Sequence, residues 1–271
     1  DIKMGSEEYF GDPGKVELMR RAASLYQLVQ HDPRFAYYGR LVALSDPGED
    51  TFTMMKSLAR LQGAGVCYYF PKAAAEELYA KLESAGFKTD RHEHYWGGEK
   101  AFRASQRVLA DVQMPGDITV QRLDDATPSS LVCEVAALLQ SCDVMPVPGN
   151  FLRGRTRPGI TMVAVDRSGN PVASASSFVI HHSTSSHATD VFWGMLATRE
   201  DRRGQKIALQ LGAMAIEHMW LNEGARGFMT GVRNDNHSSQ ALCNKLGVYD
   251  SDWIYASCLY EALLGSSSVT R

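Results

Sequence analysis

The chain has 271 residues, of which 44% are hydrophobic and 22% are charged, and its formal net charge at pH 7 is -3. These proportions are typical of a globular protein with a large buried core, so fibrous and intrinsically disordered classes are excluded. A slightly acidic chain also gives nucleic-acid binding no electrostatic support, and we expect no nucleic-acid partner.

The cysteines and the apolar runs bear on where the protein works. The five cysteines are widely spaced and form no Cys-x-x-Cys pair, which argues against a disulfide framework and against a zinc knuckle. No run reaches the ~18 apolar residues of a membrane-spanning helix, and the first residues lack the basic-then-apolar pattern of a secretory leader. We therefore expect a cytoplasmic protein with reduced thiols and no membrane partner.

The amino-terminal third reads as alternating helices and strands. Helical spacing of apolar residues, with proline and glycine as punctuation, predicts helices over 14–30, 53–62, 71–86 and 101–112. An apolar run predicts a buried strand over 63–70, and a second strand follows Gly86. We find no catalytic spacing here and interpret residues 1–114 as an α/β domain.

Turn residues at 113–117 mark a boundary, after which a second unit, 115–271, begins. Its expected strands are 117–123, 160–166, 171–182, 189–198, 227–232 and 253–260. Its expected helices are 128–142, a long apolar helix after Gly204 and 237–247, while 145–159 reads as a loop. An antiparallel meander followed by helix, strand, helix and strand predicts an α/β (α+β) fold. Its mixed, mostly antiparallel and twisted sheet is flanked by helices.

One segment of this unit gathers basic residues around a glycine. Arg202, Arg203 and Lys206 surround Gly204 at the point where a strand pattern gives way to a helical one. A helix start leaves about four N–H groups unpaired and carries roughly half a positive charge, so it attracts anions. Gly204 would let a phosphate approach the backbone closely. The segment is therefore either a solvated helix start or a phosphate cradle.

Two segments together resemble the GCN5-related N-acetyltransferase (GNAT) superfamily, over roughly 117–260. The first runs from Arg203 to Ala208 and is similar to the R-G-x-G-x-A turn that opens a helix in that family. Lys206 stands where the family has its second glycine, and as a helical residue it would keep its N–H. Leu211 follows where the family has an apolar residue.

The second segment, 236–248, is similar to the family pattern N-x-x-A-x-x-L-Y-x-K-L-G-F. The matching residues are Asn236, Leu242, Lys245, Leu246 and Gly247. Cys243 stands where a tyrosine is common and Val248 where phenylalanine is. In the family the asparagine helps to hold the pantetheine arm, and the tyrosine often protonates the departing thiolate.

The resemblance implies a GNAT-like fold and acetyl-CoA as co-substrate. By analogy, the residues expected to bind acetyl-CoA are Leu196, Ala197, Thr198, Arg202, Arg203, Gly204, Gln205, Lys206, Ile207, Ala208, Asn236 and Ser239. In such a reaction a neutral amine attacks the thioester carbonyl directly, and backbone N–H groups hold the oxyanion. Here those N–H groups would be those of Leu196 and Thr198, on one side of a strand.

The remaining catalytic candidates are weaker. Asp190 is the nearest carboxylate and a candidate base, although an acid there would equally cap a strand end. Cys243 is a candidate acid, although a thiol is a poor hydrogen-bond donor and a buried cysteine is more often a small apolar residue. Tyr249 and Tyr255 lie nearby in sequence as alternative acids.

Two further groups of residues were weighed as ligand sites. Arg153, Arg155 and Arg157 are candidates to receive an acceptor carboxylate or phosphate, with a solvated surface loop as the equal alternative. His92 and His94 alternate along a strand and share a face, but no third ligand is evident, so no metal site is expected.

The expected function is an acyl-CoA-dependent N-acyltransferase that moves acetyl from acetyl-CoA to a small-molecule primary amine in a ternary complex. The alternatives are a non-catalytic coenzyme A-binding module, because Lys206 and Cys243 depart from the family pattern, and a protein-lysine acetyltransferase. We expect a monomer or homodimer. Because 77–87 echoes the later helix and turn, we interpret the amino-terminal domain as a partial or degenerate GNAT-like copy that covers the acceptor cleft.

Overall fold

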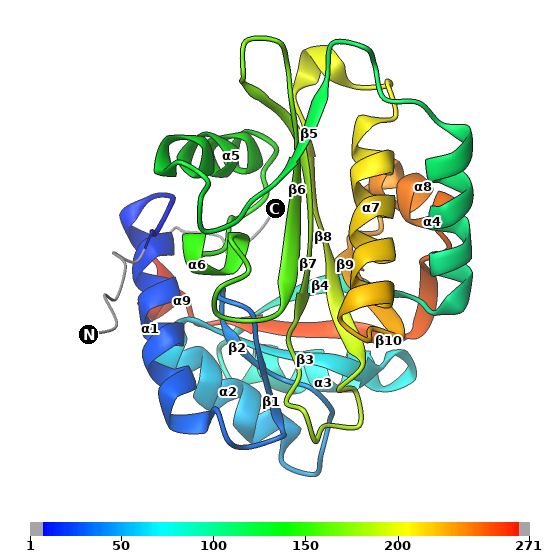
Figure 1. The fold of residues 1–271 in the computed structure, drawn as a ribbon. Coiled ribbons are helices and arrows are strands. Elements are labelled where there is room, and N and C mark those ends of the chain that lie inside the picture. The colour runs from blue at the N-terminus through cyan, green and yellow to red at the C-terminus, as the bar shows by residue number, and fades with distance from the viewer. Residues whose placement is uncertain (1–7, 266–271) are drawn as a thin grey trace.

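The computed structural model describes residues 8–265, whose strands form one ten-stranded sheet (Figure 1). The strands are β1 Phe35–Tyr37, β2 Val42–Leu44, β3 Ala64–Pro71, β4 Lys88–Gly97, β5 Thr119–Arg122, β6 Gly159–Val165, β7 Pro171–Val179, β8 Asp190–Thr198, β9 Gly227–Val232 and β10 Tyr249–Leu259. The α-helices are α1 Pro13–Val29, α2 Thr51–Gln62, α3 Ala75–Ser84, α4 Glu99–Asp111, α5 Ser129–Ser141, α6 Gly149–Leu152, α7 Ile207–Asn222, α8 His237–Lys245 and α9 Glu261–Leu264. Within these residues no helix is both long and apolar enough to cross a bilayer.

The elements predicted from periodicity are confirmed, with differences at short or irregular segments. β1 and β2 were not predicted, because three residues are too few to show a period of two. The predicted loop 145–159 contains the one-turn helix α6. β10 begins at Tyr249, earlier than the predicted 253, because polar residues precede its apolar core.

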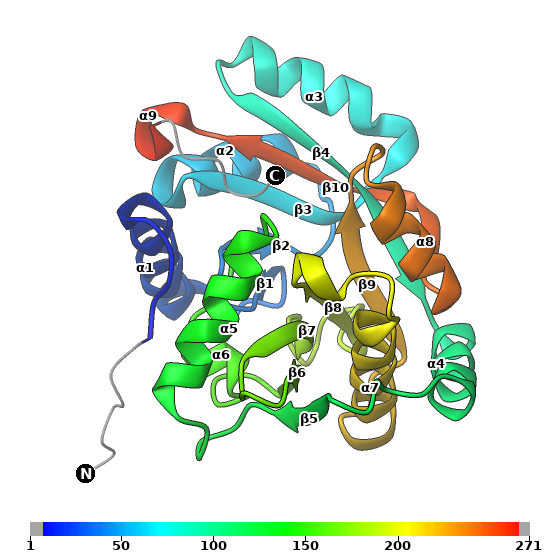
Figure 2. The ribbon, with the colours of Figure 1, turned by 90° about the horizontal axis from the view of Figure 1, so that it is seen from above.

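The sheet is mixed and mostly antiparallel, as predicted. β5, β6, β7 and β8 form a continuous antiparallel meander, whereas β8 and β9 pair in parallel. Helix α7 packs on β6, β7 and β8 from one face with α4 beside it, and α5 covers the other face (Figure 2). Trp193 of β8 fixes α7 in place, because its buried Nε1 donates to the carbonyl oxygen of Gly212 at 3.0 Å.

The two halves of the chain exchange strands. The sheet order is β1-β2-β3-β10-β4-β9-β8-β7-β6-β5, so the last strand, β10, lies between β3 and β4, and β4 lies between β10 and β9. The unit β3–α3–β4 therefore corresponds to β9–α8–β10, and the parallel pair β2–β3 corresponds to β8–β9. This arrangement agrees with a GNAT-like amino-terminal part, and the sequence echo falls on the corresponding helices α3 and α8.

The exchange also joins the cores of the two halves. The largest cluster of buried apolar side chains runs from Ala22 in α1 to Cys258 in β10 and includes Phe178 and Met229. The predicted boundary near 114 falls between α4 and β5. The division into domains at that point stays a prediction, because the sheet and the core continue across it.

A close backbone approach marks the junction between the halves. Gly97 ends β4 and lies against Gly247, the residue with φ of 72° that reverses the chain between α8 and β10. A Cβ atom at Gly97 would collide with the carbonyl oxygen of Gly247 and come within 2.9 Å of the Ala101 Cβ atom. Glycine at position 97 therefore lets the exchanged strands seat against each other.

We expect Gly97→Ala to lower the free energy of unfolding by about 1–3 kcal/mol, because the added methyl overpacks a backbone contact. Gly116→Ala is the matched control, since a Cβ there would meet nothing within 4 Å, and it should change stability by less than about 0.5 kcal/mol. Urea unfolding of the two variants measures the difference. Equal midpoints would contradict the described junction.

Candidate functional site

The site lies where β8 and β9 separate. Their parallel pairing covers three positions, the last joining Phe192 to Met229, and a bulge then interrupts the pairing of β8 with β7 opposite Ala175. In the bulge, Gly194 has φ of 154° and Met195 has φ of 51°. A pocket of about 220 Å³ occupies the opening, and Leu196 lines it. The splay and the bulge leave strand backbone facing a cavity rather than a neighbouring strand.

One wall of the pocket is the start of α8. Asn236 caps this helix, since its Oδ1 accepts from the Ser239 N–H at 3.1 Å. Asn236, Ser239 and Cys243 all line the pocket. Cys243 is 2% exposed, and burial raises the pKa of its thiol to about 12, so it stays protonated at neutral pH.

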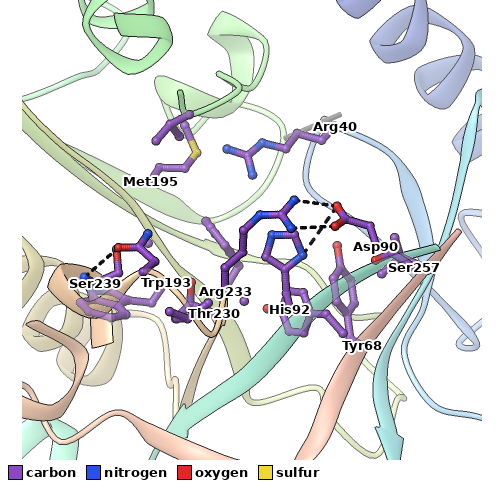
Figure 3. A pocket seen from close by; sticks show the side chains of 18 of the residues that line it. Arg40, Tyr68, Asp90, His92, Trp193, Met195, Thr230, Arg233, Ser239 and Ser257 are labelled. Carbon is purple, nitrogen blue, oxygen red and sulfur yellow. Dashed lines mark hydrogen bonds and ion pairs between the residues drawn. The ribbon is translucent and has the colours of Figure 1, made fainter. Parts of the chain in front are cut away.

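The opposite wall comes largely from the amino-terminal half and contains groups that the sequence analysis did not assign. Asp90 and His92 project from β4 into the pocket, and Arg233 reaches them from the end of β9 (Figure 3). Arg233 pairs with Asp90 through two contacts, at 2.9 and 3.0 Å. His92 Nδ1 lies 3.9 Å from Asp90 Oδ2, which also accepts a hydrogen bond from Arg233. Tyr255 is the residue of β10 that faces His92 in the sheet register.

The surroundings of His92 keep its imidazole neutral. Burial lowers the pKa of His92, and the positive charges of Arg233 and Arg40 lower it further. Asp90 acts in the opposite direction, yet the pKa of His92 stays below 6.5. At neutral pH the pocket therefore contains the uncharged imidazole of His92 beside the Asp90 carboxylate, whose negative charge is balanced by Arg233.

In the basic turn after β8, one cation is used in an ion pair and two are exposed to solvent. Arg202 forms a two-contact ion pair with Asp117, at 2.8 and 2.9 Å, and so ties the turn to the residues before β5. Arg203 and Lys206 are exposed, and Arg203 Nε donates to the Thr198 carbonyl oxygen at 3.4 Å. We expected a helical Lys206. It instead precedes α7 in the left-handed conformation, with φ of 60°, which is the conformation that favours glycine.

The structure distributes the residues predicted to bind acetyl-CoA over two neighbouring places. Those that line the pocket are Leu196, Asn236 and Ser239. Those at the turn before α7 are the half-buried Arg202 and the exposed Arg203, Gly204, Gln205 and Lys206, followed by the buried helix residues Ile207 and Ala208. Ala197 and Thr198 complete β8 between the two places.

Two of the predicted catalytic residues lie outside the pocket lining. Asp190 starts β8 and is held by the Tyr69 hydroxyl at 2.6 Å and the Trp96 indole at 3.2 Å. Burial raises the pKa of Asp190, but hydrogen bonds from these groups and from His187 bring it below its usual range, so it is a poor base. Tyr249 is 48% exposed and lines a separate surface hollow beside α4.

The arginine-rich loop before β6 does not contribute to the pocket lining. Arg153 is buried and pairs with Glu8 at 2.9 Å, and Arg155 pairs with Asp125. Arg157 donates to the Tyr26 hydroxyl at 2.7 Å. These contacts favour the structural alternative, because the donors of the three arginines hold other parts of the chain.

His92 had been weighed only as half of a metal pair with His94. His94 is fully buried, and within residues 8–265 no cluster of three histidine, cysteine or acidic side chains is arranged to hold a metal ion. Asp90 and His92 are two residues apart and share one face of a strand, and this was the signal in the sequence that could have pointed to a base beside a carboxylate. Nothing in the sequence indicated which partners that face would meet.

The profile of the Acetyltransferase (GNAT) family matches residues 138–248, which span β6 to α8 and thus the bulge, the basic turn and the start of α8. No curated protein matches the chain in sequence.

Solved structures resemble most of the chain at low sequence identity. A GCN5-related N-acetyltransferase from Kribbella flavida is 13% identical over 89% of this chain and 95% of its own, with a TM-score of 0.56. A tandem GNAT protein from the clavulanic acid biosynthesis pathway is 18% identical over 79% of this chain and 68% of its own, with a TM-score of 0.51. A GCN5-related N-acetyltransferase-like protein from Streptococcus suis is 17% identical over 90% of this chain and 99% of its own, with a TM-score of 0.50.

At these identities the structural likeness establishes the fold. The family profile gives evidence of a second kind, because it matches the sequence of the segment that contains the β8 bulge, the basic turn and the start of α8. The profile match therefore assigns residues 138–248 to a domain of the GCN5-related N-acetyltransferase family.

Proposed function

We propose that this protein is an acyl-CoA-dependent N-acyltransferase that moves acetyl from acetyl-CoA to a primary amine of a small molecule by direct attack. The observation that carries the proposal is one pocket with two walls of different chemistry. The bulge of β8 and the start of α8 form one wall, and the neutral base His92 lies in the other. The GNAT domain supports acyl-CoA as the donor.

The start of α7 fits the pyrophosphate of acetyl-CoA. Gly204 has φ of 78°, and a Cβ atom there would meet nothing within 4 Å, so the backbone is open to an approaching phosphate. The first N–H groups of a helix lack intrahelical acceptors and attract anions. Arg203 and Lys206 add exposed positive charge beside them. Arg202 does not contact the phosphates in this proposal, and its ion pair with Asp117 holds the turn in position.

The bulge and His92 supply the catalytic groups of the proposed reaction. Leu196 lines the pocket inside the bulge, so its N–H is better located than that of Thr198 to stabilise the oxyanion formed from the thioester. The acceptor arrives as an ammonium ion, and neutral His92 accepts its proton, directly or through a water. Asp90 lies beside Nδ1 of the ring and stabilises the imidazolium that forms.

The leaving thiolate needs little help from the protein, since a thiol titrates near ~8.5. Cys243 is protonated and faces the pocket, but a thiol is a weak donor, so we give it no catalytic role. The pocket volume of about 220 Å³ favours a small acceptor over the protein-lysine alternative. We also propose that the protein needs no metal, works in the cytoplasm and is a monomer or a homodimer.

We expect acetyl-CoA at 100 times its dissociation constant to stabilise the wild-type protein by about 2.7 kcal/mol. Arg203→Glu should lose most of this gain, because a carboxylate at the turn repels the pyrophosphate. Arg20→Glu makes the same charge change on the exposed face of α1 and should keep the gain. Thermal unfolding of the wild type and both variants, with and without acetyl-CoA, measures the stabilisation. No stabilisation of the wild type would overturn the proposal.

We expect the pH profile of kcat/KM to carry an acidic limb below pH 6.5, because the lowered pKa of His92 leaves the ring neutral above that limb. His92→Gln should lose this limb and lower kcat/KM by roughly 10²- to 10⁴-fold. The profile is measured by release of free thiol, and any limb that belongs to the acceptor amine is common to both enzymes.

His31→Gln is the control, because His31 is exposed in the loop after α1 and should leave the profile unchanged. An acidic limb that persists in His92→Gln would assign the base to another group.

A further inference from the structure

The pocket contains a second cation, on the side of the amino-terminal half. Arg40 lies between β1 and β2, lines the pocket and points into it across from Met195 (Figure 3). Its Nη2 donates to the Met145 carbonyl oxygen, and its Nη1 lies 3.4 Å from the Tyr38 hydroxyl. These contacts hold the guanidinium in place without neutralising it.

Arg40 has no carboxylate partner in the part of the chain that the structure describes. Within residues 8–265 no ion pair includes it, and its Nε is buried without a hydrogen-bond acceptor. Asp90, the carboxylate beside His92, is already paired with Arg233. Asp143 lines the pocket from an exposed position and forms no ion pair with Arg40. Arg40 is half-buried and its Nε atom is fully buried. A half-buried charge without a counter-ion and a buried donor without an acceptor are both costly, so this corner is suited to an anion.

A second unsatisfied donor faces the same corner. Tyr255 is 8% exposed and lines the pocket, and its hydroxyl is buried without a partner. Tyr68 and Arg40 line the same pocket, and the Tyr68 ring centre lies 4.9 Å from that of Tyr255. Burial raises the pKa of Tyr255 and of Tyr68, and the positive charge of Arg40 opposes both rises. The same charge acts on His92. The anion corner and the proposed base are therefore parts of one small pocket.

We propose that the acceptor is an amino acid or a similar small amine that carries a carboxylate, with that carboxylate bound by Arg40 and Tyr255 and the amine directed to His92. This inference rests on the proposed function and names its substrate class. A carboxylate offers two acceptor oxygens to the guanidinium fork and the hydroxyl. A single unpaired cation suits a monoanion better than a phosphate dianion.

The rest of the wall supports a compact acceptor. Tyr38, Tyr68 and Phe192 surround the corner with aromatic surface, and Arg40 lies 5.7 Å from the Tyr38 ring centre and 6.0 Å from that of Phe192. Such a surface suits the apolar part of an amino acid. A lysine side chain within a protein lacks the free carboxylate that this corner requires.

The test compares each amino acid with its decarboxylated amine, for example phenylalanine with phenethylamine and lysine with cadaverine, by release of thiol from acetyl-CoA. We expect the best amino acid to exceed its amine by roughly 10- to 100-fold in kcat/KM, the effect of a charge-assisted hydrogen-bonded pair. Arg40→Gln should abolish this preference, which is read as the ratio of the two kcat/KM values because loss of the Arg40 charge also acts on His92 and so changes both reactions alike. Tyr255→Phe, which keeps the ring, should reduce the preference several-fold.

Arg20→Gln is the matched control and should leave the preference unchanged. Calorimetric titration of the same amino acids into the protein saturated with coenzyme A gives a readout that needs no turnover, and Arg40→Lys, which keeps the charge, provides a second variant if Arg40→Gln does not fold. Binding that Arg40→Gln weakens, without thiol release by any amine, would support the carboxylate site while contradicting the proposed function.

Two outcomes would overturn the inference. One is equal turnover of amino acids and their amines in the wild type, or faster turnover of a terminally blocked lysine peptide, which would leave the transferase function intact. The other is neither binding nor turnover of any amino acid by a protein that acetyl-CoA stabilises.

Discussion

The site depends on the early end of the parallel pairing between β8 and β9. After Phe192 the two strands no longer share hydrogen bonds, and the bulge at Met195 and Leu196 turns the β8 backbone into the opening. This opening would expose apolar surface and unpaired backbone unless something covered it. The exchanged strands β4 and β10 provide the cover, so the amino-terminal half becomes a wall of the pocket rather than a separate module.

The distribution of charge explains why one half of a pseudo-symmetric chain binds the cofactor in our account. The turn between β8 and α7 exposes Arg203 and Lys206. The corresponding turn between β2 and α2 carries Asp46, Glu49 and Asp50, which would repel a pyrophosphate. In the proposed reaction, β3, α3 and β4 of the amino-terminal half would instead help to close the acceptor side.

The parts of the fold and site that sequence could predict were local. Long apolar periods gave the helices and the meander, and the turn at Arg203 and the segment at Asn236 indicated the cofactor side, because each is a continuous motif. Arg40, His92 and Tyr255 could not be grouped, since they meet only through the exchange of β4 and β10. Asp190 and Tyr249 were candidates by proximity in sequence, but they are the first residues of β8 and β10 and lie outside the pocket lining.

The central claim is that one pocket, built by both halves, joins the thioester to a base and an acceptor. A crystal structure of the protein with coenzyme A tests it most directly. The account predicts the pyrophosphate at the start of α7, the pantetheine arm between β8 and β9, and the sulfur at the bulge on the side that faces His92. A coenzyme A molecule bound elsewhere, or with its sulfur outside this pocket, would contradict the account.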